Sequence, residues 1–419
     1  MIKSFLSTSF LLLCLVLNGQ ITVDEWMQSQ LGKITWQETY KGVLADYHPV
    51  TLILASDHSQ VAGYMIHDAD QRIHKLVGEW DAGERLQLQE RDGFDRLTGY
   101  LTGTVSADQA ILRWLSADQS RTFDVKAFPE KLIKIKNFKP AAEWIQIEAA
   151  KPMYLSVQKM DYGIVSGMVN QDGLYRRFDG QCLDGTCSMW KADIPDNKGS
   201  YLTIQMRQKD PVTYKAMVGG TEYKATILFT TPLSVRHFDN SMGFLDFVYP
   251  QLESKFYNEW ITAHVDSSWN IGVQQLTQGN ELESPGRLVY RSSGWVEIID
   301  ESPSHITGMM TFIHPDVIQR EVFVWLKKED VFVLQDELMN IPGDLNKASG
   351  LALASADHHM DKEYASWLQD VGYTLLLPTI GGVAMTTEFS MLYGDELQLL
   401  PIEESKELIK RKYWKYFGW

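Results

Sequence analysis

The sequence predicts a mainly β protein in which tandem small antiparallel β-units, built as meanders or barrels, precede an α+β domain that combines a helix with a sheet. The first observation behind this prediction is a glycine-punctuated alternation of apolar and polar residues, which starts near Val50 and returns near Tyr154. Such alternation is typical of strands that bury one face. The second is a change after residue 238, where apolar residues recur at helical spacing. Because 419 residues exceed what one hydrophobic core usually supports, we expect more than one domain.

Residues 1–20 match a secretory signal peptide. Lys3 supplies the positive start, an apolar run extends from Phe10 to Leu17, and Asn18 to Gln20 offer a cleavage region. The apolar run is shorter than the roughly 20 residues that span a bilayer. We therefore predict an exported protein, periplasmic or extracellular, with no transmembrane segment after the signal is removed.

The formal net charge of −15 repels phosphate backbones. Because nucleic-acid affinity comes largely from lysine and arginine, we predict no nucleic-acid partner. Hydrophobic residues make up 44% of the chain and charged residues 22%, which favours globular domains over disorder. The basic cluster from Lys406 to Lys415 is interleaved with aromatic residues and is interpreted as a terminal helix that docks on the last domain.

Residues 21–48 are interpreted as a lead-in segment and residues 49–130 as the first β-unit. Short strand-like runs separated by turn signals, such as Asp92-Gly93, favour a meander, small barrel or sandwich over βαβ units. Residues 131–152 form a linker, in which the alternation from Lys131 to Lys136 predicts one further strand.

The second β-unit, residues 153–237, contains Cys182 and Cys187. The Asp184-Gly185 pair between them is a strong signal for a type I′ hairpin turn. In that hairpin the cysteines face each other at a non-hydrogen-bonded position, whose short Cα separation suits a cross-strand disulfide. A metal-binding or redox-active pair is the alternative, but the mature chain offers no further thiols.

Residues 238–419 form the predicted α+β domain. Apolar residues from Phe244 onwards recur at three- and four-residue steps, which predicts an amphipathic helix through about Val265, with Pro250 starting or kinking it. Strand-like runs follow at residues 287–290, 295–299 and 322–326.

Asp357, His358 and His359 form the densest set of potential metal ligands. Adjacent histidines point in different directions on a helix or strand, whereas the HExxH zinc motif places both on one helical face. A solvated loop therefore explains this segment better than a metal site, and no cofactor is predicted.

Trp80, Trp114 and Trp190 lie on predicted strands and are the candidate glycan-binding residues. Flat aromatic faces stack on sugar rings much as they stack on one another. The alternative is that these side chains fill the core, as strand aromatics usually do.

No catalytic residue is predicted. Ser156 and Lys159 fit the S-x-x-K spacing of serine acyltransferases, but that chemistry needs a helix and this segment has the pattern of a strand. Carboxylates such as Glu297 with Glu301, or Glu403 with Glu404, would do glycosidase chemistry only if the fold set a pair across a cleft.

Residues 294–299, 304–308 and 322–338 resemble an RsiV-type extracellular domain, a family found in lysozyme-sensing anti-sigma factors and at the front of some peptidoglycan deacetylases. The resemblance spans at most residues 240–410. It implies a helix, strands around a Thr-Gly-Gly-Ala-His turn, an Asp-Glu-Leu-like helix and a late strand pair. This chain keeps Thr307 and Gly308 of the turn but lacks its histidine, which argues against lysozyme binding.

We therefore predict an exported, non-enzymatic binding or adaptor protein of the bacterial cell envelope, which presents its β-units and α+β domain to a protein or glycan partner. One alternative is a polysaccharide- or cell-wall-acting hydrolase, which would need two facing carboxyl groups with separated pKa values in a cleft. The other is a structural spacer in an envelope assembly, which would show a large exposed apolar patch.

Overall fold

The computed structural model divides the chain into two compact units. The first consists of residues 1–41 and 50–129, and the second of residues 42–49 and 130–419. The second β-unit and the α+β domain of the prediction thus fall within one unit. The described residues are 23–45, 48–68, 72–81, 85–133, 139–150, 152–171, 174–183, 186–191, 204–210, 212–218, 220–240, 243–278, 290–314, 317–340, 374–386 and 397–419.

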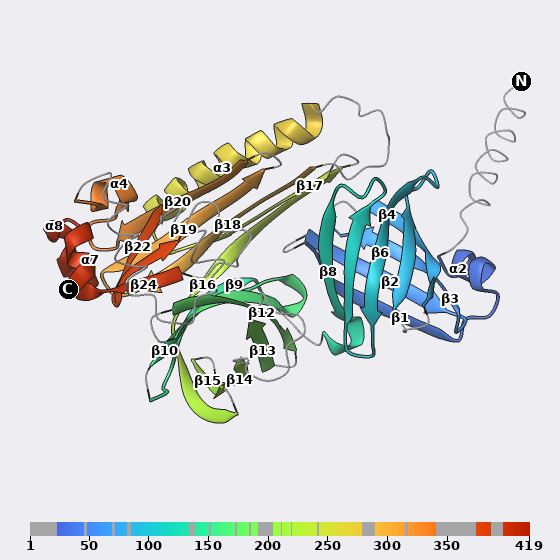
Figure 1. The fold of residues 1–419 in the computed structure, drawn as a ribbon, viewed down its shortest axis with the longest axis horizontal. Helices are drawn as coiled ribbons and strands as arrows, with labels where there is room; N and C mark the ends of the chain where they lie inside the picture. Colours follow the sequence, from blue (N-terminus) through green and yellow to red (C-terminus); the bar gives the residue numbers. More distant parts are fainter. Residues whose placement is uncertain are drawn as a thin grey trace, which may run out of the picture. The chain divides into compact units, whose positions relative to one another are not determined.

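Strands β1 to β8 close into a barrel (Figure 1). The barrel makes up most of the first unit, but residues 42–44 and 48–49, at the ends of its first two strands, belong to the second unit. The strands follow one another around the barrel in chain order, and the last pairs with the first. Residues 36–44, which we expected in the lead-in segment, supply the first of them. The strands are β1 (Trp36–Leu44), β2 (His48–Ser56), β3 (Gln60–His67), β4 (Arg72–Trp80), β5 (Leu86–Arg91), β6 (Leu97–Val105), β7 (Ala110–Ser116) and β8 (Thr122–Pro129).

Along each strand, side chains alternate between the inside and the outside of the barrel. In β5, Leu86, Leu88 and Glu90 are buried, whereas Gln87 and Gln89 are exposed. The outside is partly covered by the helix α2 (Val23–Leu31), whose buried residues pack against apolar side chains of β2 and β3.

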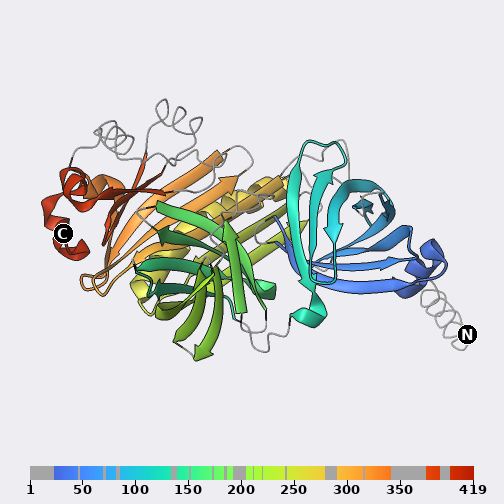
Figure 2. The same ribbon diagram turned by 60° about the horizontal axis from the view of Figure 1, so that its bottom comes forward.

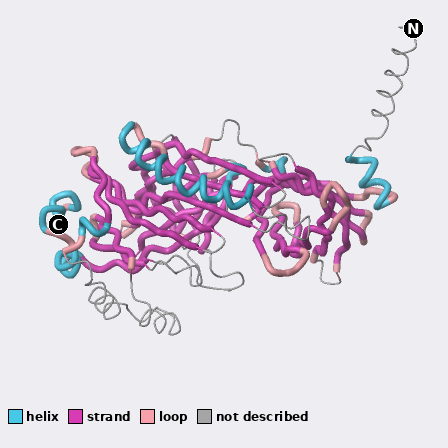
Figure 3. The backbone as a smooth tube through the Cα atoms, turned by 90° about the horizontal axis from the view of Figure 1, so that it is seen from above, coloured by secondary structure: helices cyan, strands magenta, loops and turns pink. Residues whose placement is uncertain are grey.

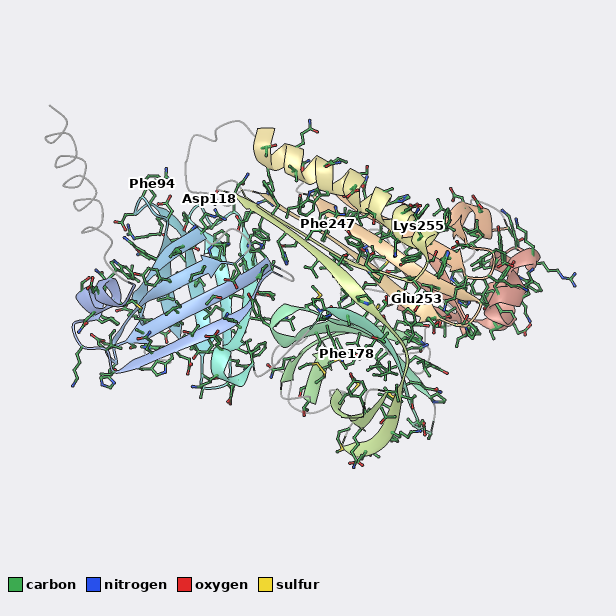
Figure 4. The ribbon with its side chains drawn as sticks, turned by 180° about the vertical axis from the view of Figure 1, so that it is seen from behind. Phe94, Asp118, Phe178, Phe247, Glu253 and Lys255 are labelled. Atoms are coloured by element: carbon green, nitrogen blue, oxygen red, sulfur yellow. A yellow bond between two sulfur atoms is a disulfide. The ribbon has the colours of Figure 1, made fainter. Side chains whose placement is uncertain are left out.

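A second ring of strands opens the second unit (Figure 2). Each strand pairs antiparallel with the next, and the last one, β16, pairs with both β15 and β9, which closes the ring. Phe178 is buried in its core (Figure 4). The strands are β9 (Ala141–Ile147), β10 (Met153–Lys159), β11 (Ile164–Gln171), β12 (Leu174–Leu183), β13 (Thr186–Lys191), β14 (Ile204–Asp210), β15 (Thr213–Val218) and β16 (Thr221–Asn240), with short 3₁₀ turns at Glu130–Leu132 and Asp161–Gly163.

Cys182 and Cys187 face each other across β12 and β13, with Cα atoms 3.9 Å apart, and form a disulfide. Both belong to the ring's apolar core. The predicted cross-strand pairing of these cysteines is therefore confirmed.

The two rings place glycines at matching positions. A Cβ on Gly63 of β3 or on Gly167 of β11 would lie 2.1 or 2.2 Å from a carbonyl oxygen of the preceding strand. On Gly78 of β4 or Gly180 of β12, it would lie 1.9 or 2.0 Å from a carbonyl oxygen of the following strand. Because no side chain fits at these distances, the strand backbones approach closely at the same places in both rings. These paired glycines account for the punctuated repeat in the sequence.

β16 continues beyond the ring into a second sheet, where its last residues pair with β17 (Gly243–Pro250). The parallel strand β18 (Tyr290–Glu301) follows, and then the antiparallel strands β19 (His305–His314), β20 (Val317–Leu326) and β21 (Val331–Leu334). The long helix α3 (Lys255–Gln278) lies along one face of this sheet (Figure 3). Phe247 of β17 points towards α3, where it meets the ring of Trp269 at 5.4 Å (Figure 4).

The opposite face of this sheet is covered by the second ring and by a small sheet. Met168 and Tyr175, on the outside of the ring, pack against Ile299, Met309 and Val322. The remaining elements are α4 (Gln335–Leu338), β22 (Leu375–Thr379), β23 (Gly382–Thr386), β24 (Leu397–Pro401), α7 (Ile402–Leu408) and α8 (Arg411–Phe417). The mainly β class with a C-terminal helix-and-sheet region is thus confirmed.

The predicted helix start at Phe244 is wrong. Residues 243–250 form a buried strand, and the helix begins only at Lys255, where Ser254 Oγ accepts the N–H of Tyr257 at 3.1 Å. β17 lies between β16 and β18 and is buried on both faces, so its continuous apolar run has no strand alternation. Periodicity alone does not separate such a strand from a buried helix.

Two further local predictions are corrected. Lys131 and Leu132 belong to a 3₁₀ turn rather than to a strand, and Ile133 has no regular structure. Residues 134–136 of that predicted strand lie outside the described residues. Thr307 and Gly308 lie within β19 rather than at a turn. None of the helices in the described part of the chain combines the length and apolarity that crossing a membrane requires.

Candidate functional site

A groove of ≈ 620 Å³ lies on the outer face of the first barrel. Its walls come from β3 to β7, from Gln119 after β7, and from Gln30 and Leu31 at the end of α2. The groove therefore depends on the pairing of these neighbouring strands and on α2, which packs on the same barrel.

Two neighbouring cross-strand rows of side chains line this groove. One row runs Gln60, Glu79, Gln87 and Thr102 across β3 to β6, each directly opposite the next. The other runs Val77, Gln89, Tyr100 and Leu115 across β4 to β7. The first row is polar throughout, whereas the second places a partly buried tyrosine between an amide and an aliphatic side chain.

The first row is exposed, and its members present both hydrogen-bond donors and acceptors. A glutamine amide offers two N–H donors and one carbonyl oxygen, which matches the donor and acceptor character of a sugar hydroxyl. Gln89 is held in place by Arg91, whose Nη2 donates to Gln89 Oε1 at 3.0 Å. The lining thus suits a neutral ligand rich in hydroxyl groups.

Glu79 is the only carboxylate among the described residues that line the groove. Glycoside hydrolysis by the usual two-carboxylate route needs an acid and a second carboxylate about 5–9 Å away. The described lining of the groove does not supply that pair.

The tryptophans predicted as glycan platforms lie elsewhere. Trp114 is fully buried inside the first barrel, where it stacks on Phe123 at 5.6 Å, so its face is not open to a sugar. Trp80 is half-buried and donates from Nε1 to Ser56 Oγ at 3.3 Å. The side chain of Trp190 lies outside the described residues.

Glu90 is buried inside the first barrel and carries a dense set of hydrogen bonds. It lies 2.9 Å from His74 Nδ1 and accepts the indole N–H of Trp114 at 2.7 Å and the hydroxyl of Thr98 at 2.9 Å. Burial alone would raise the pKa of Glu90, but the hydrogen bond from His74 and the neighbouring imidazole of His67 hold it below its ordinary value. The network connects side chains of β4, β5, β6 and β7 inside the barrel.

The second ring contains a comparable buried network. Lys159 Nζ lies 2.7 Å from Glu143 Oε1 and also contacts the hydroxyl of Tyr214, which donates to Glu143 Oε2 at 2.8 Å. Burial, followed by the charge of Glu143, raises the pKa of Tyr214, so its hydroxyl stays neutral and donates. Ser156, on the opposite face of β10, donates to the backbone oxygen of Ile298. Ser156 and Lys159 therefore do not form a catalytic pair.

The carboxylates considered for hydrolysis are engaged separately. Glu297 is buried and pairs with Arg177 at 2.7 Å. Glu301 pairs with Lys327. Glu403 lies in the first turn of α7 with its side chain 85% exposed.

His305 has serine and aspartate partners that resemble a catalytic triad. Its Nδ1 lies 2.7 Å from Ser302 Oγ, and its Nε2 lies 3.2 Å from Asp300 Oδ2. His305 is fully buried, however, and Nδ1 also lies 3.0 Å from the backbone oxygen of Tyr416. Ser302 Oγ accepts the N–H groups of Ser304 and His305, as in an ordinary serine turn. The cluster fastens α8 to the β18–β19 turn.

The candidate metal ligands Asp357, His358 and His359 lie outside the described residues. The groove residues were missed by sequence reasoning, although the Q-L-Q run at residues 87–89 carries a visible signal. Alternation showed that these glutamines lie on the polar face of a strand. It did not show that these glutamines would line a groove near the end of α2.

No protein-family model matches this sequence, and no curated protein matches it. Among solved structures, a DUF3298 family protein from Pseudomonas aeruginosa PAO1 matches with a TM-score of 0.32 and 10% sequence identity. The match covers 43% of this chain and 95% of that chain. A TM-score this low does not establish a shared fold. The resemblance to RsiV-type domains therefore stays a prediction.

Proposed function

We propose that this chain is an exported, non-enzymatic binding protein of the bacterial cell envelope, and that the groove on its first barrel takes a segment of a glycan. The observation that carries the proposal is the pair of cross-strand rows in the groove, one polar and one built around Tyr100. Amide side chains suit the hydroxyl groups of a sugar, and the tyrosine ring suits its apolar face. The volume of ≈ 620 Å³ falls in the usual range for small-molecule sites, about 300–1,000 Å³.

Two further observations are compatible with export. The disulfide between Cys182 and Cys187 suits an oxidising compartment outside the cytosol. The apolar run after Lys3 has the length of a signal-peptide core.

Binding explains the groove better than hydrolysis does, because its described lining holds one carboxylate, Glu79. The alternative of a structural spacer would require a large exposed apolar patch. The large apolar side chains that are exposed in the described residues are scattered over turns, strands and α3, and only Phe256 and Ile271 share an element.

The proposal is tested by isothermal titration of the purified chain with a panel of soluble oligosaccharides from cell walls and plants. We expect saturable binding by one class of oligosaccharide, with no release of shorter fragments over time. The double variant Gln87→Ala/Gln89→Ala should lower the affinity at least tenfold, because it removes amide contacts from both rows. Both side chains are exposed, so the fold should be unaffected.

Arg113→Ala is the matched control, because Arg113 lies opposite Thr102 on the same outer face but outside the groove lining. Unchanged binding by the glutamine variant, or an equal loss in the control, would contradict the assignment to the groove. Release of fragments would point to the hydrolase alternative instead.

A further inference from the structure

Two histidines and two aspartates of the second unit converge at the hairpin between β16 and β17. His237 of β16 lies directly opposite Asp246 of β17, and its Nδ1 is 2.7 Å from Asp246 Oδ1. His48 brings Nδ1 to 3.1 Å from the same oxygen. One ligand atom from each of these three residues lies within 4.8 Å of the other two.

The fourth residue, Asp239, holds His48 from its other side. Asp239 Oδ2 lies 2.9 Å from His48 Nε2, and both side chains are fully buried. Metal-bound histidines usually place one ring nitrogen on the ion and the other on a carboxylate, which orients the ring. His48 already has this arrangement, with Nε2 on Asp239 and Nδ1 towards Asp246 and His237.

His237 has the least complete set of hydrogen bonds in the cluster. Its Nε2 is buried with no hydrogen-bond partner among the described residues. Its side chain is 17% exposed, which leaves the cluster a route to solvent at this point. Nδ1, which faces Asp246 at 2.7 Å, is therefore the nitrogen of His237 that the cluster offers to an ion.

We propose that His48, His237 and Asp246 bind a divalent transition-metal ion of the zinc type, with Asp239 as the carboxylate that orients His48. Two imidazoles and a carboxylate are donors that zinc accepts in a tetrahedral site, with a fourth position left for water. Bonds of about 2.0–2.1 Å place tetrahedral ligand atoms about 3.3 Å apart. The distances from Asp246 Oδ1 to the two histidines, 2.7 and 3.1 Å, therefore need to lengthen by less than about 1 Å. A divalent cation also offsets the charge of two buried aspartates.

The competing explanation is a metal-free network in which His48 bridges the two aspartates. The two explanations differ in one measurable respect, which is whether the chain takes up zinc at this hairpin. Both histidines and both aspartates are far in sequence from the His358-His359 pair, so variants separate the two candidate sites.

The test is isothermal titration of the chelator-treated full chain with zinc sulfate, followed by X-ray absorption at the zinc edge. We expect one zinc ion per chain, with nitrogen and oxygen neighbours at about 2.0–2.1 Å and no sulfur near 2.3 Å. Asp246→Asn should abolish this binding, and Asp239→Asn should weaken it by about 10–100-fold. His237→Gln provides a second ligand variant at a partly exposed position, should Asp246→Asn fail to fold.

His58→Gln, which removes an exposed histidine, is the control for loose surface binding. The double variant His358→Gln/His359→Gln tests the other histidine pair. Zinc uptake that persists in both Asp246→Asn and His237→Gln, or that is lost only in the His358/His359 variant, would overturn the proposal. So would the absence of binding at micromolar zinc in a chain that circular dichroism shows to be folded.

Discussion

Lys159 Nζ lies 2.7 Å from Glu143 Oε1 inside the second ring, and the two side chains are only 12% and 9% exposed. The first barrel has Glu90 in a comparable setting, fully buried and hydrogen-bonded to His74 and Trp114. Each ring therefore holds one buried carboxylate that is satisfied by a basic side chain and an aromatic donor.

Lys159→Met should destabilise the second unit by about 3–5 kcal/mol, because it leaves the carboxylate of Glu143 buried without its cation. Urea unfolding followed by circular dichroism measures the change. Lys224→Met is the control on the same ring, since Lys224 pairs with Glu148 at 2.8 Å but both side chains are at least half exposed. We expect Lys224→Met to lower the free energy of unfolding by less than about 1 kcal/mol. Equal effects of the two variants would contradict a structural role for the buried pair.

Removing the disulfide should cost a modest amount of stability. The loop between Cys182 and Cys187 is short, with a sequence separation of 5. Closing so short a loop contributes about 2 kcal/mol on the chain-entropy model. The variant Cys182→Ala/Cys187→Ala should therefore unfold at lower urea concentration while keeping its β-sheet spectrum. A free-thiol titration of the unfolded, non-reduced wild-type chain that detects both cysteines would refute the bond itself.

Stability should fall in acid through Glu90, whose pKa is lowered in the fold. The ionised form is thus the one that the folded barrel favours. The contribution of ionised Glu90 to the free energy of unfolding is fully present at pH values above its unfolded-state pKa of about 4.3. It is lost as the pH falls through the lower folded-state pKa.

Glu90→Gln should flatten this part of the pH profile, because an amide keeps much of the hydrogen bonding but does not titrate. Urea unfolding at several pH values between about 3 and 7 gives the comparison. Glu79→Gln, an exposed carboxylate of the same barrel, should leave the profile unchanged. If the wild type and Glu90→Gln lost stability in parallel on acidification, the acid sensitivity would have to come from other groups.

A chain that ends at residue 237 should not keep a well-ordered second ring. Ser156 and Gln158 donate to the backbone oxygens of Ile298 and Val296, and the outer apolar residues of the ring pack on the same sheet. Truncation leaves these donors without acceptors and exposes apolar surface. We expect dye binding by the truncated chain and faster hydrogen exchange in β9 to β16 than in the whole chain. Equal protection in both chains would show that the ring is independent.

The class of fold followed from the sequence because its signals are local. Alternation gave the strands, paired glycines gave the repeat, and the Asp-Gly turn gave the register of Cys182 and Cys187. β17 was predicted to be part of a helix, because a strand that is buried on both faces has no alternation of apolar and polar residues. β1 was missed because its exposed half reads as mixed polar sequence, and only closure of the barrel makes it a strand.

The candidate sites could not be predicted because they depend on contacts distant in sequence. His48 and Asp246 are separated by 198 residues, and neither has a neighbour along the chain that completes a metal motif. His237 and Asp239 do form an H-x-D pair, but that pair gains meaning only when β17 places Asp246 opposite it. The groove similarly depends on how neighbouring strands and the end of α2 come together, which periodicity does not encode.

The two rings should tolerate mutation unequally, although their paired glycines are equivalent. Strand-facing glycines such as Gly63 and Gly167 are constrained alike in both, because backbone atoms occupy the space of a side chain. The outer faces of the two rings differ. On the second ring, residues such as Arg177 and Met168 contact the C-terminal sheet. Residues on the outer face of β4 to β7 line the groove instead, so their sequence is free to change with a ligand. Among natural variants of this chain, substitutions should therefore concentrate on the outer face of the first barrel. Substitutions on the outer face of the second ring should occur together with compensating changes in the sheet against which it packs.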